Sequence, residues 1–544
     1  MQGAPLVVMH TEPKSTARSR KITRAHLVGG GIASLAAAAI LVRDGGILGD
    51  HVTIYEELER VGGSLDGAGD PEHGYKLRGG RMIESKDLCM FDLFSSVPSL
   101  DGDHTVTREL AQWNEVMKTR SNARLVRHGH RVAAARLDLP ERDIRAIEQL
   151  VLEPEALLGN DRITDHFEPS FFETSFWLMW CTTFAFQPWH SVAELRRYFV
   201  RFLHRVDGMH ELRGIMRMPY NHYDSLVLPL RRWLEERGVR FQLGTRITEI
   251  EFTKHGDEQV AEVLVFDRGG ERGRIPVHAH DLVIATLGSM TDASSWGSMD
   301  VPAPLDDAPS GSAWALWRQI AAERPELGRP SVFANHVAES KWMSFTTTLR
   351  STELFDRVRV LTGNVPGEGG LITFVDSGWL MSIVLPHQPH FLDQPEGVQV
   401  FWGYALSVDR PGTFVDKPMT SCSGREIMTE LLGHLGVSEH AETILADAIC
   451  LPCMMPFITS QFLRREEGDR PAVHPVGYSN FAITGQFCEQ PDDVVFTVEY
   501  SVRSAMTAVY ELLGLDRKPP PVYKGLHDPR NVLKAFLALH DLGA

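Results

Sequence analysis

The chain has 544 residues, of which 43% are hydrophobic and 23% are charged, and its formal net charge is −16. This length exceeds the roughly 250–300 residues at which a single core stops growing, so we expect two or three domains. The ordinary composition excludes wholesale disorder. The acidic balance excludes a nucleic-acid partner, whose phosphates require an excess of Lys and Arg. The same charge repels anionic substrates at long range, so any such substrate needs local positive groups.

Neither a secretory signal nor a membrane span is expected. The first 24 residues carry basic side chains but no apolar core region. The most apolar stretch, Leu27–Val42, has three glycines near its start and falls short of a span. Cys450 and Cys453 form a lone C-x-x-C without a second pair at zinc spacing, so we expect a reduced pair and no metal site. The predicted location is the cytoplasm.

The N-terminal part of the chain alternates strand and helix signals. Ala25–Val28 is a short apolar run, Gly29–Gly31 a turn, and Ile32–Val42 an Ala-rich helix. His51–Tyr55 is a second apolar run that ends at Glu56. Strand, glycine turn, helix and strand in this order predict a βαβ unit.

The rest of the chain is mixed. Periodicity is mostly helical from about 100 to 235, as in Ala193–Val206, and the alternation over Val239–Phe266 predicts a pair of strands. Asp281–Ala285 predicts a strand that leads into a glycine turn. Near the C-terminus, Asn480–Thr484 predicts a strand and Val494–Leu513 a helix.

The first glycine turn predicts a dinucleotide site. Gly29 permits the tight turn, Gly31 lets the backbone approach a pyrophosphate, and the small Ser34 stands where a third glycine is usual. The helix that follows directs free N–H groups at phosphates. Glu56 ends the second strand, where a carboxylate accepts hydrogen bonds from ribose hydroxyls. The alternative is that these glycines form tight surface turns.

Two further loops indicate that the dinucleotide is FAD. Gly62-Gly63-Ser64 and Arg78-Gly79-Gly80-Arg81 resemble flavoprotein loops that run beside the FAD pyrophosphate and ring. The chain also closes with strand, Gly485 and helix, as in flavoproteins that return a helix N-terminus to the flavin. The predicted cofactor-binding residues are Gly29, Gly31, Ile32, Ala33, Ser34, Glu56, Glu57, Gly63, Ser64, Arg78, Gly79, Gly80, Arg81, Ile247, Gly288, Ser289, Asp493 and Thr497.

Several longer stretches resemble the oleate hydratase family, once called myosin-cross-reactive antigens. They are Gly62–Gly67 (GGSLDG), Arg78–Arg81 (RGGR), Asp92–Leu100 (DLFSSVPSL), Gln187–Ser191 (QPWHS), Ser225–Pro229 (SLVLP), Gln399–Tyr404 (QVFWGY), Cys453–Leu463 (CMMPFITSQFL) and Gly485–Ala505 (GQFCEQPDDVVFTVEYSVRSA). With the nucleotide motif, the resemblance runs from about residue 25 to 505, which is most of the chain.

The resemblance implies an FAD-dependent hydratase that adds water to the cis-9 double bond of oleic acid, with linoleic acid as a further substrate, giving 10-hydroxy fatty acids. The expected fold is α/β, with a Rossmann-type FAD-binding domain that is discontinuous in sequence, an inserted α+β substrate domain and a short helical C-terminal segment. The expected divisions are a flexible N-terminal arm (1–22), the FAD domain (23–95, 236–300 and 475–515), the substrate region (96–235 and 301–474) and the C-terminal segment (516–544).

The family uses a tyrosine to protonate the alkene and a glutamate to activate water. The tyrosine matches Tyr198, whose neighbours Arg196 and Arg197 are expected to ease phenolate formation. The glutamate that should follow RGGR is replaced by Met82, which cannot take a proton. Either Glu84, two residues on and on the same face of an extended segment, replaces it, or no general base is used. The second case costs about 10²–10⁴ in rate.

The carboxylate-binding residues implied by the family also differ. Its Gln in Y-N-Q-Y becomes His222, which as an imidazolium attracts a carboxylate. Its Thr and Asn become Val384 and Pro386, whereas its His is kept as His390. We therefore expect altered head-group recognition, with a purely structural His222 as the alternative.

Three questions stay open at this level. Pro521–Ala544 is either an amphipathic helix that contacts a membrane peripherally or a helix docked on its own domain. The oligomeric state is uncertain, with monomer and dimer both open. The competing functions are a redox flavoenzyme of the amine-oxidase or desaturase type, and a flavin-containing lipid-binding protein with weakened catalysis.

Overall fold

A parallel sheet forms the first part of the molecule. The computed structural model describes residues 22–80, 82–134, 136–306 and 310–540. In its parallel sheet Ala25 pairs with both Val52 and Leu282, so the first strand lies in the middle. The predicted βαβ unit and the Rossmann-type α/β class are confirmed. The strand order is β20 (Phe481–Thr484), β13 (Leu282–Thr286), β1 (Ala25–Val28), β2 (Val52–Tyr55) and β9 (Arg240–Gln242).

Helices cover this sheet because it is apolar on both faces. α1 (Ile32–Arg43) is buried from Ile32 to Leu41, and its run of alanines lets it pack closely against α15 (Val498–Leu512). α15 begins four residues later than predicted, because the Thr497 side chain accepts a hydrogen bond from the Tyr500 N–H and caps the helix. α2 (Leu88–Phe94) and α8 (Leu228–Glu236) complete this layer.

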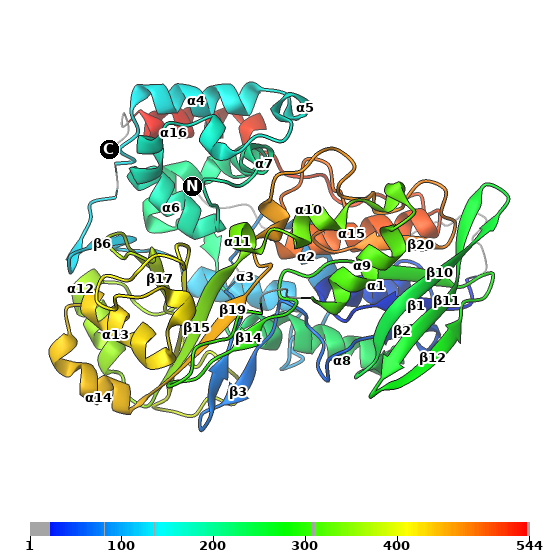
Figure 1. Ribbon diagram of the computed structural model, residues 1–544, viewed down its shortest axis with the longest axis horizontal. Coiled ribbons are helices and arrows are strands. Elements are labelled where there is room, and N and C mark those ends of the chain that lie inside the picture. The colour runs from blue at the N-terminus through cyan, green and yellow to red at the C-terminus, as the bar shows by residue number, and fades with distance from the viewer. Residues whose placement is uncertain (1–21, 81, 135, 307–309, 541–544) are drawn as a thin grey trace.

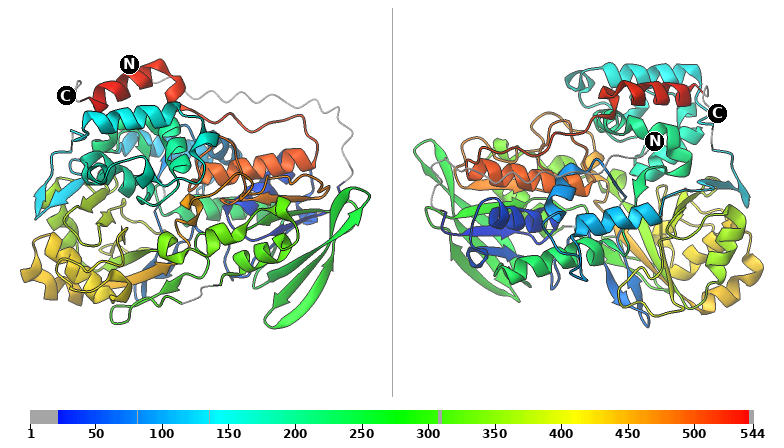
Figure 2. Two further views of the ribbon diagram at one scale, coloured as in Figure 1. Left: turned by 45° about the horizontal axis from the view of Figure 1, so that its top comes forward. Right: turned by 180° about the vertical axis from the view of Figure 1, so that it is seen from behind.

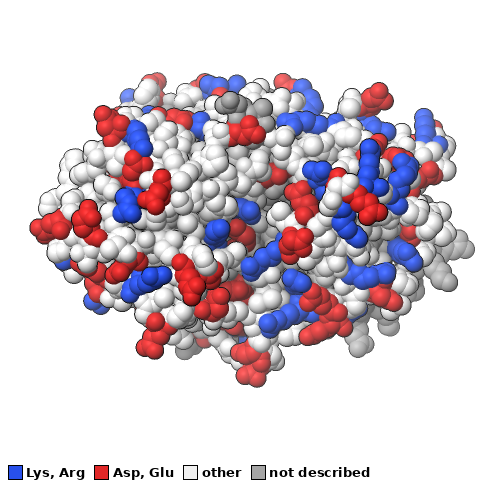
Figure 3. Space-filling model, turned by 60° about the horizontal axis from the view of Figure 1, so that its bottom comes forward, with Lys and Arg blue, Asp and Glu red and all other residues white. Residues whose placement is uncertain are grey.

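A separate antiparallel sheet projects from the parallel one (Figure 1). It contains β10 (Arg246–His255), β11 (Glu258–Arg268) and β12 (Glu271–Pro276), so the predicted strand pair is in fact three strands. Cross-strand ion pairs such as Arg274–Glu251, at 2.6 Å, join its exposed side chains. On the face shown in Figure 3, basic and acidic side chains are likewise interspersed.

An eight-stranded mixed sheet forms the second part of the molecule. Its central strands β15, β18 and β19 are almost entirely buried and belong to a second hydrophobic core. Figure 1 shows this sheet beside the parallel one, with α12 (Glu353–Thr362) and α13 (Gly424–His434) at its outer side. The strand order is β14 (Ser295–Trp296), β19 (Ala448–Met455), β15 (Trp342–Leu349), β18 (Gln399–Ala405), β17 (Met381–Val384), β16 (Leu371–Phe374), β6 (Leu125–Arg127) and β7 (His130–Arg131).

A helical group lies above the eight-stranded sheet (Figures 1 and 2). The C-terminal helix α16 packs against the 3₁₀ segment Leu203–Glu211 and buries Ala535 and Leu539, so it docks on its own chain. Among the described residues, no helix is long and apolar enough to cross a membrane. The group consists of α4 (Glu141–Leu152), α5 (Glu155–Leu158), α6 (Ser175–Phe184), α7 (Val192–Phe202) and α16 (Pro529–Leu539).

The domain divisions remain a prediction, and one detail of the core bears on them. The strands of the parallel sheet all fall inside the three segments expected for the FAD domain. However, α9 (Ser312–Ala321) contributes Trp314 and Trp317 to the hydrophobic core of that sheet. This helix lies in sequence within the segment 301–474, so the chain crosses between the two cores more often than the predicted divisions allow.

Candidate active site

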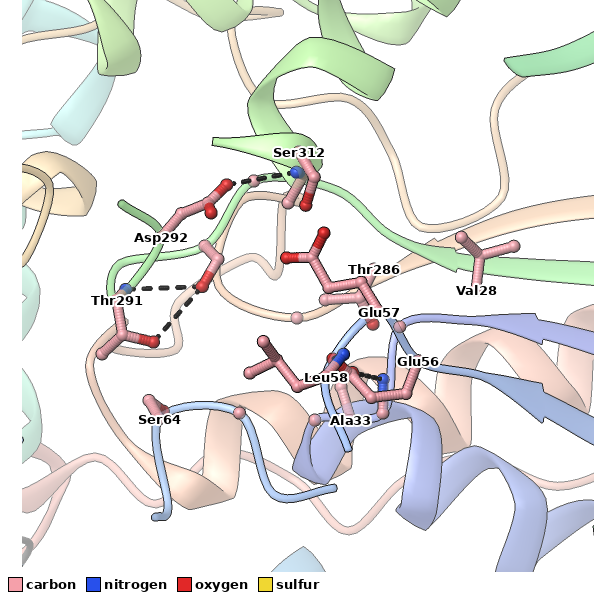
Figure 4. A pocket seen from close by; sticks show the side chains of 18 of the residues that line it. Val28, Ala33, Glu56, Glu57, Leu58, Ser64, Thr286, Thr291, Asp292 and Ser312 are labelled. Atoms are coloured by element: carbon pink, nitrogen blue, oxygen red, sulfur yellow. Dashed lines mark hydrogen bonds between the residues drawn. The ribbon is translucent and has the colours of Figure 1, made fainter. Parts of the chain in front are cut away.

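The first cavity lies where β1, β2 and β13 end, and we call it the nucleotide cavity (Figure 4). Ligands of open α/β sheets bind at this edge, outside the carboxyl ends of the strands. Glycines and small side chains form its floor, and carboxylates form part of its wall. Twelve predicted cofactor residues line it: Gly29, Gly31, Ile32, Ala33, Glu56, Glu57, Gly63, Ser64, Arg78, Ile247, Gly288 and Ser289.

The floor of the nucleotide cavity fits a pyrophosphate. α1 has neither a capping side chain nor an acidic residue in its first turn, so its N-terminal N–H groups remain available to an anion. A Cβ added to Gly31 would meet nothing nearer than the Gly63 Cα at 4.0 Å, so the space above Gly31 is open. Arg78 lines the cavity and forms an ion pair with Asp66 at 3.4 Å, while its buried Nε has no hydrogen-bond partner among the described residues.

Glu56 stands at the ribose position of such a site. Its carboxylate accepts hydrogen bonds from the backbone N–H groups of Gly30, at 2.6 Å, and Leu58, at 2.9 Å. Burial raises the pKa of Glu56, and the two backbone bonds oppose that shift. The carboxylate is therefore held in a fixed orientation at the end of β2, as ribose recognition requires.

Two predicted cofactor residues lie outside the lining of the nucleotide cavity because the protein itself uses their side chains. The Asp493 carboxylate is buried in an ion pair with Arg503 at 2.6 Å. Thr497 caps α15 and borders a different cavity. For both residues, cofactor contact stays a prediction.

Three other predicted residues have indirect or different places. The Ser34 hydroxyl lies 3.0 Å from the Thr286 hydroxyl and joins α1 to β13, which is the packing role of a third glycine. Gly79 and Gly80 line a second cavity. Arg81 lies outside the described residues.

Sequence reasoning missed several lining residues that no glycine motif marks. Thr286 ends β13, and Gln486 and Ser501 come from the loop and helix near the C-terminus. Asp292 lies on the loop after β13, and its pKa is raised to about 6 by burial and by the neighbouring Glu57. Figure 4 shows Glu57 and Asp292 in the same wall of the cavity. Only Gly485, noted above as a turn before the last helix, gave a signal for this region.

The second cavity lies against β15, β16, β17 and β18 of the eight-stranded sheet, and we call it the apolar cavity. Its volume is about 100 Å³. Aromatic side chains of the large sheet, such as Trp342 and Trp402, form much of its wall. The predicted substrate residues His222, His390, Val384 and Pro386 all line it, together with Met82.

A third, smaller cavity holds the predicted catalytic residues, and we call it the Tyr198 cavity. It is lined by Tyr198, Met82 and Glu84, and it shares Gly80 and Met82 with the apolar cavity. The Tyr198 side chain is buried, and its hydroxyl donates a hydrogen bond of 2.6 Å to the backbone oxygen of Val495. The structure thus brings the predicted proton donor next to the predicted substrate site.

Glu84 shares the Tyr198 cavity but its carboxylate is occupied. Arg201 donates a hydrogen bond to one oxygen, and Arg205 and His204 bond the other at 2.7 and 2.9 Å. Despite burial, hydrogen bonding and these charges hold the pKa of Glu84 far below its usual range. A carboxylate stabilised in this way is a poor proton acceptor, so the geometry argues against Glu84 as the replacement base.

The contacts of Arg196 and Arg197 do not support the expectation that they ease phenolate formation at Tyr198. Arg197 forms ion pairs of 2.7 Å with Glu155 and Glu489, and Arg196 donates to the backbone oxygen of Glu153 at 2.6 Å. Both guanidinium groups are therefore engaged elsewhere. A run of basic residues in the sequence cannot show which of them are already neutralised.

The strip from Arg78 to Met82 connects the three cavities. Arg78 lines the nucleotide cavity, Gly79 and Gly80 line the apolar cavity, and Met82 lines both the apolar and the Tyr198 cavities. A bound dinucleotide would therefore be a direct neighbour of a ligand in the apolar cavity.

The fold and the nucleotide cavity together define a dinucleotide-binding α/β protein with a second, largely apolar cavity. A family model described as MCRA matches residues 22–510, and the chain belongs to this MCRA family. It is 38% identical to a protein named oleate hydratase from Streptococcus pyogenes serotype M49 (strain NZ131), over 95% of this chain and 90% of that protein. It is 32% identical to a protein named linoleate hydratase from Lactiplantibacillus plantarum, over 95% and 99%.

Among solved structures, the chain resembles cyclohexylamine oxidase from Brevibacterium oxydans IH-35A. The TM-score is 0.52 at 12% sequence identity, over 91% of this chain and 100% of that one. At this identity the likeness concerns the fold alone. The likeness confirms the predicted architecture. It gives no support to the alternative that this protein is a redox flavoenzyme.

Proposed function

We propose that this protein is an FAD-dependent hydratase that adds water to the cis-9 double bond of an unsaturated fatty acid such as oleic acid. One observation carries the proposal: Met82 lines both the apolar cavity and the buried cavity of Tyr198. A long apolar ligand can thus present a mid-chain bond to a phenolic proton. The hydratase names of both curated relatives support the same reaction.

Tyr198 is the proposed proton donor. Its O–H proton goes to one alkene carbon, and the oxygen of a water molecule bonds to the other, which carries the developing positive charge. The water then loses one proton, which restores the phenol. Atoms and charge balance without an oxidant or a reductant, and the Tyr198 side chain that donates the proton is buried.

Met82 has no group that can act as a base. Its thioether cannot accept the proton released by water, and Glu84 is held by cations. In our proposal the proton therefore returns to the Tyr198 oxygen rather than to a separate carboxylate. Working without a separate base costs about 10²–10⁴ in rate, so we expect slow but measurable turnover.

FAD is the proposed cofactor of the nucleotide cavity. The N-terminus of α1 and the open face of Gly31 would hold its pyrophosphate beside the Arg78–Asp66 ion pair, and Glu56 its ribose. Because hydration involves no net redox change, the cofactor supplies structure and electrostatics beside the apolar cavity.

The first experiment is incubation of the FAD-loaded protein with oleic acid, with and without a flavin reductant, followed by mass analysis. Formation of 10-hydroxystearic acid would establish the hydratase. Unchanged oleate with measurable oleate binding would favour the lipid-binding protein instead. Consumption of oxygen with flavin reduction would favour the redox enzyme.

Peripheral membrane contact is a second, separate proposal. α16 turns Val532, Leu533 and Phe536 outward, with 39%, 59% and 43% of their surface exposed. Such a stripe suits the interface of a bilayer in which the substrate is dissolved. Sedimentation with phosphatidylcholine–phosphatidylglycerol vesicles tests it: the Leu533→Ser/Phe536→Ser double variant should bind less, and equal binding would reject the contact.

A further inference from the structure

Arg217 lies directly after β8 (Ile215–Met216), and its side chain lines the apolar cavity. The backbone at this point is held on both sides by one residue of α3 (Val106–Val116): the Arg217 N–H donates to the Asn114 Oδ1 at 2.7 Å, and the Asn114 Nδ2 donates to the Arg217 carbonyl at 2.8 Å. The base of the side chain is therefore fixed relative to the cavity.

The guanidinium group of Arg217 has no anionic partner among the described residues. Its Nε and Nη2 are buried and form no hydrogen bond there. Several other buried arginines of this chain are paired with carboxylates, for example Arg201 with Glu84 and Arg503 with Asp493, whereas Arg124 donates to the Met209 carbonyl and the Thr183 hydroxyl. Burial lowers the pKa of Arg217 to about 10, which leaves it protonated at neutral pH. Arg217 as a whole is half-buried, and an uncompensated charge with two buried donors is costly, so it requires a reason.

The surroundings of Arg217 favour an anion. Three imidazoles, those of His222, His387 and His390, line the same cavity, and its described lining contains neither Asp nor Glu. The pKa of His390 is lowered to about 3 by burial and by its positively charged or imidazole neighbours, so His390 is neutral at pH 7. It can then bond a carboxylate without adding charge.

The backbone of Gly370 lies close to the Arg217 guanidinium. A Cβ added to Gly370 would lie 3.3 Å from the Arg217 Nη2 and 3.0 Å from the Leu385 carbonyl oxygen, so a side chain at this position would crowd the guanidinium. The overall charge of −16 repels an anion at long range, so a local cation of this kind is what an acidic ligand requires.

We propose that Arg217 is the head-group receptor of this protein, binding the carboxylate of the fatty acid through a salt bridge inside the apolar cavity. The identity of the ligand rests on the proposed function. A guanidinium presents parallel N–H groups that match the two oxygens of a carboxylate. This ionic contact replaces the neutral hydrogen bonds that Val384 and Pro386 cannot make.

The test compares a charged and an uncharged ligand of the same chain. Titration calorimetry of the FAD-loaded protein with oleate and with oleyl alcohol measures both affinities. Arg217→Gln should weaken oleate binding about 10- to 100-fold, the range for a charge-assisted bond, and should change oleyl alcohol binding less than about threefold. The matched control is Arg213→Gln, at an exposed residue already paired with Glu211 and Asp207, which should change neither affinity.

Folding is monitored through the melting temperature without ligand. Because Arg217 is unpaired, Arg217→Gln should melt no lower than wild type, and only the stabilisation by oleate should shrink. An equal loss of affinity for both ligands, or no loss for oleate, would overturn the proposal. If the variant fails to fold, the wild type alone decides: it must bind oleate at least about tenfold more tightly than oleyl alcohol.

These outcomes are separable from those of the proposed function. Arg217-dependent oleate binding without hydroxy-acid formation would retain the receptor and reject the hydratase. If 10-hydroxystearic acid forms but the affinity for oleate does not depend on Arg217, the hydratase proposal is retained and the proposal that Arg217 binds the head group is rejected.

Discussion

The Tyr198 hydroxyl donates its hydrogen bond to the backbone oxygen of Val495, in the segment that leads into α15. The phenolic proton is thereby held at a defined atom inside the Tyr198 cavity. Because α15 also packs against α1 of the parallel sheet, the position of the proton depends on the same elements that build the nucleotide cavity.

Tyr198→Phe removes this proton while keeping the ring. We expect hydration of oleate to fall by about 10²–10⁴, with a stability loss of about 1–3 kcal/mol from the unsatisfied Val495 carbonyl. Product formation per folded enzyme and denaturant unfolding measure the two effects. Tyr510→Phe, which loses a hydroxyl bonded to Asp44 outside all three cavities, should retain full activity. Unimpaired hydration by Tyr198→Phe would require a different proton donor.

Glu84→Gln tests whether this residue is structural. The change leaves Arg201, Arg205 and His204 without their shared anion, so we expect a loss of about 3–5 kcal/mol in the free energy of unfolding. Turnover per folded molecule should change less than about threefold. The surface change Glu115→Gln is the control. A drop in turnover of about 10² or more with unchanged stability would instead identify Glu84 as the base.

Gly31→Ala tests how closely a cofactor approaches the backbone. The added Cβ finds open space in the protein alone, so the melting temperature without cofactor should be unchanged. It would intrude on a pyrophosphate at α1, so the Kd for FAD, measured by flavin fluorescence, should rise about tenfold or more. An unchanged Kd for FAD would mean that the phosphates of FAD do not lie against Gly31.

We expect the Asp292→Asn variant to differ from the wild type in how its stability depends on pH. The folded-state pKa of Asp292 is raised to about 6, so this group favours folding at low pH and loses that contribution as the pH rises through about 6. Removing the charge should therefore stabilise the cofactor-free protein by about 1–3 kcal/mol at pH 8 and hardly at pH 4. Denaturant unfolding at both values measures the difference. Equal effects at pH 4 and pH 8 would contradict the raised pKa.

The sequence predicted the elements whose signal is local. Strand β1 has the predicted bounds Ala25–Val28, because a short apolar run before a glycine turn has few alternatives. Strand β12 was missed, because Glu271–Pro276 is charged and exposed and lacks an apolar face. Its pairing with β11 is a tertiary effect that no window of residues contains.

The site was predicted only as far as family motifs reach. The motifs supplied the residues of the apolar cavity, including His222 and His390, which are far apart in sequence. They did not indicate that Glu84 is neutralised, since its partners lie on α7 and the segment after it. Arg217 gave no signal at all, because a buried arginine and a surface arginine look alike in a sequence.

The strip from Arg78 to Met82 contributes residues to the walls of all three cavities. Ligands bound in these cavities would therefore lie close together, and the binding of one would affect the affinity for another. If bound FAD changes the affinity for the lipid by some factor, bound lipid must change the affinity for FAD by the same factor. Where FAD raises the affinity for the lipid, a cell short of flavin would hold a protein that also releases its fatty acid. In that case a cell rich in fatty acid would retain flavin on the protein without any signal beyond the two ligands themselves.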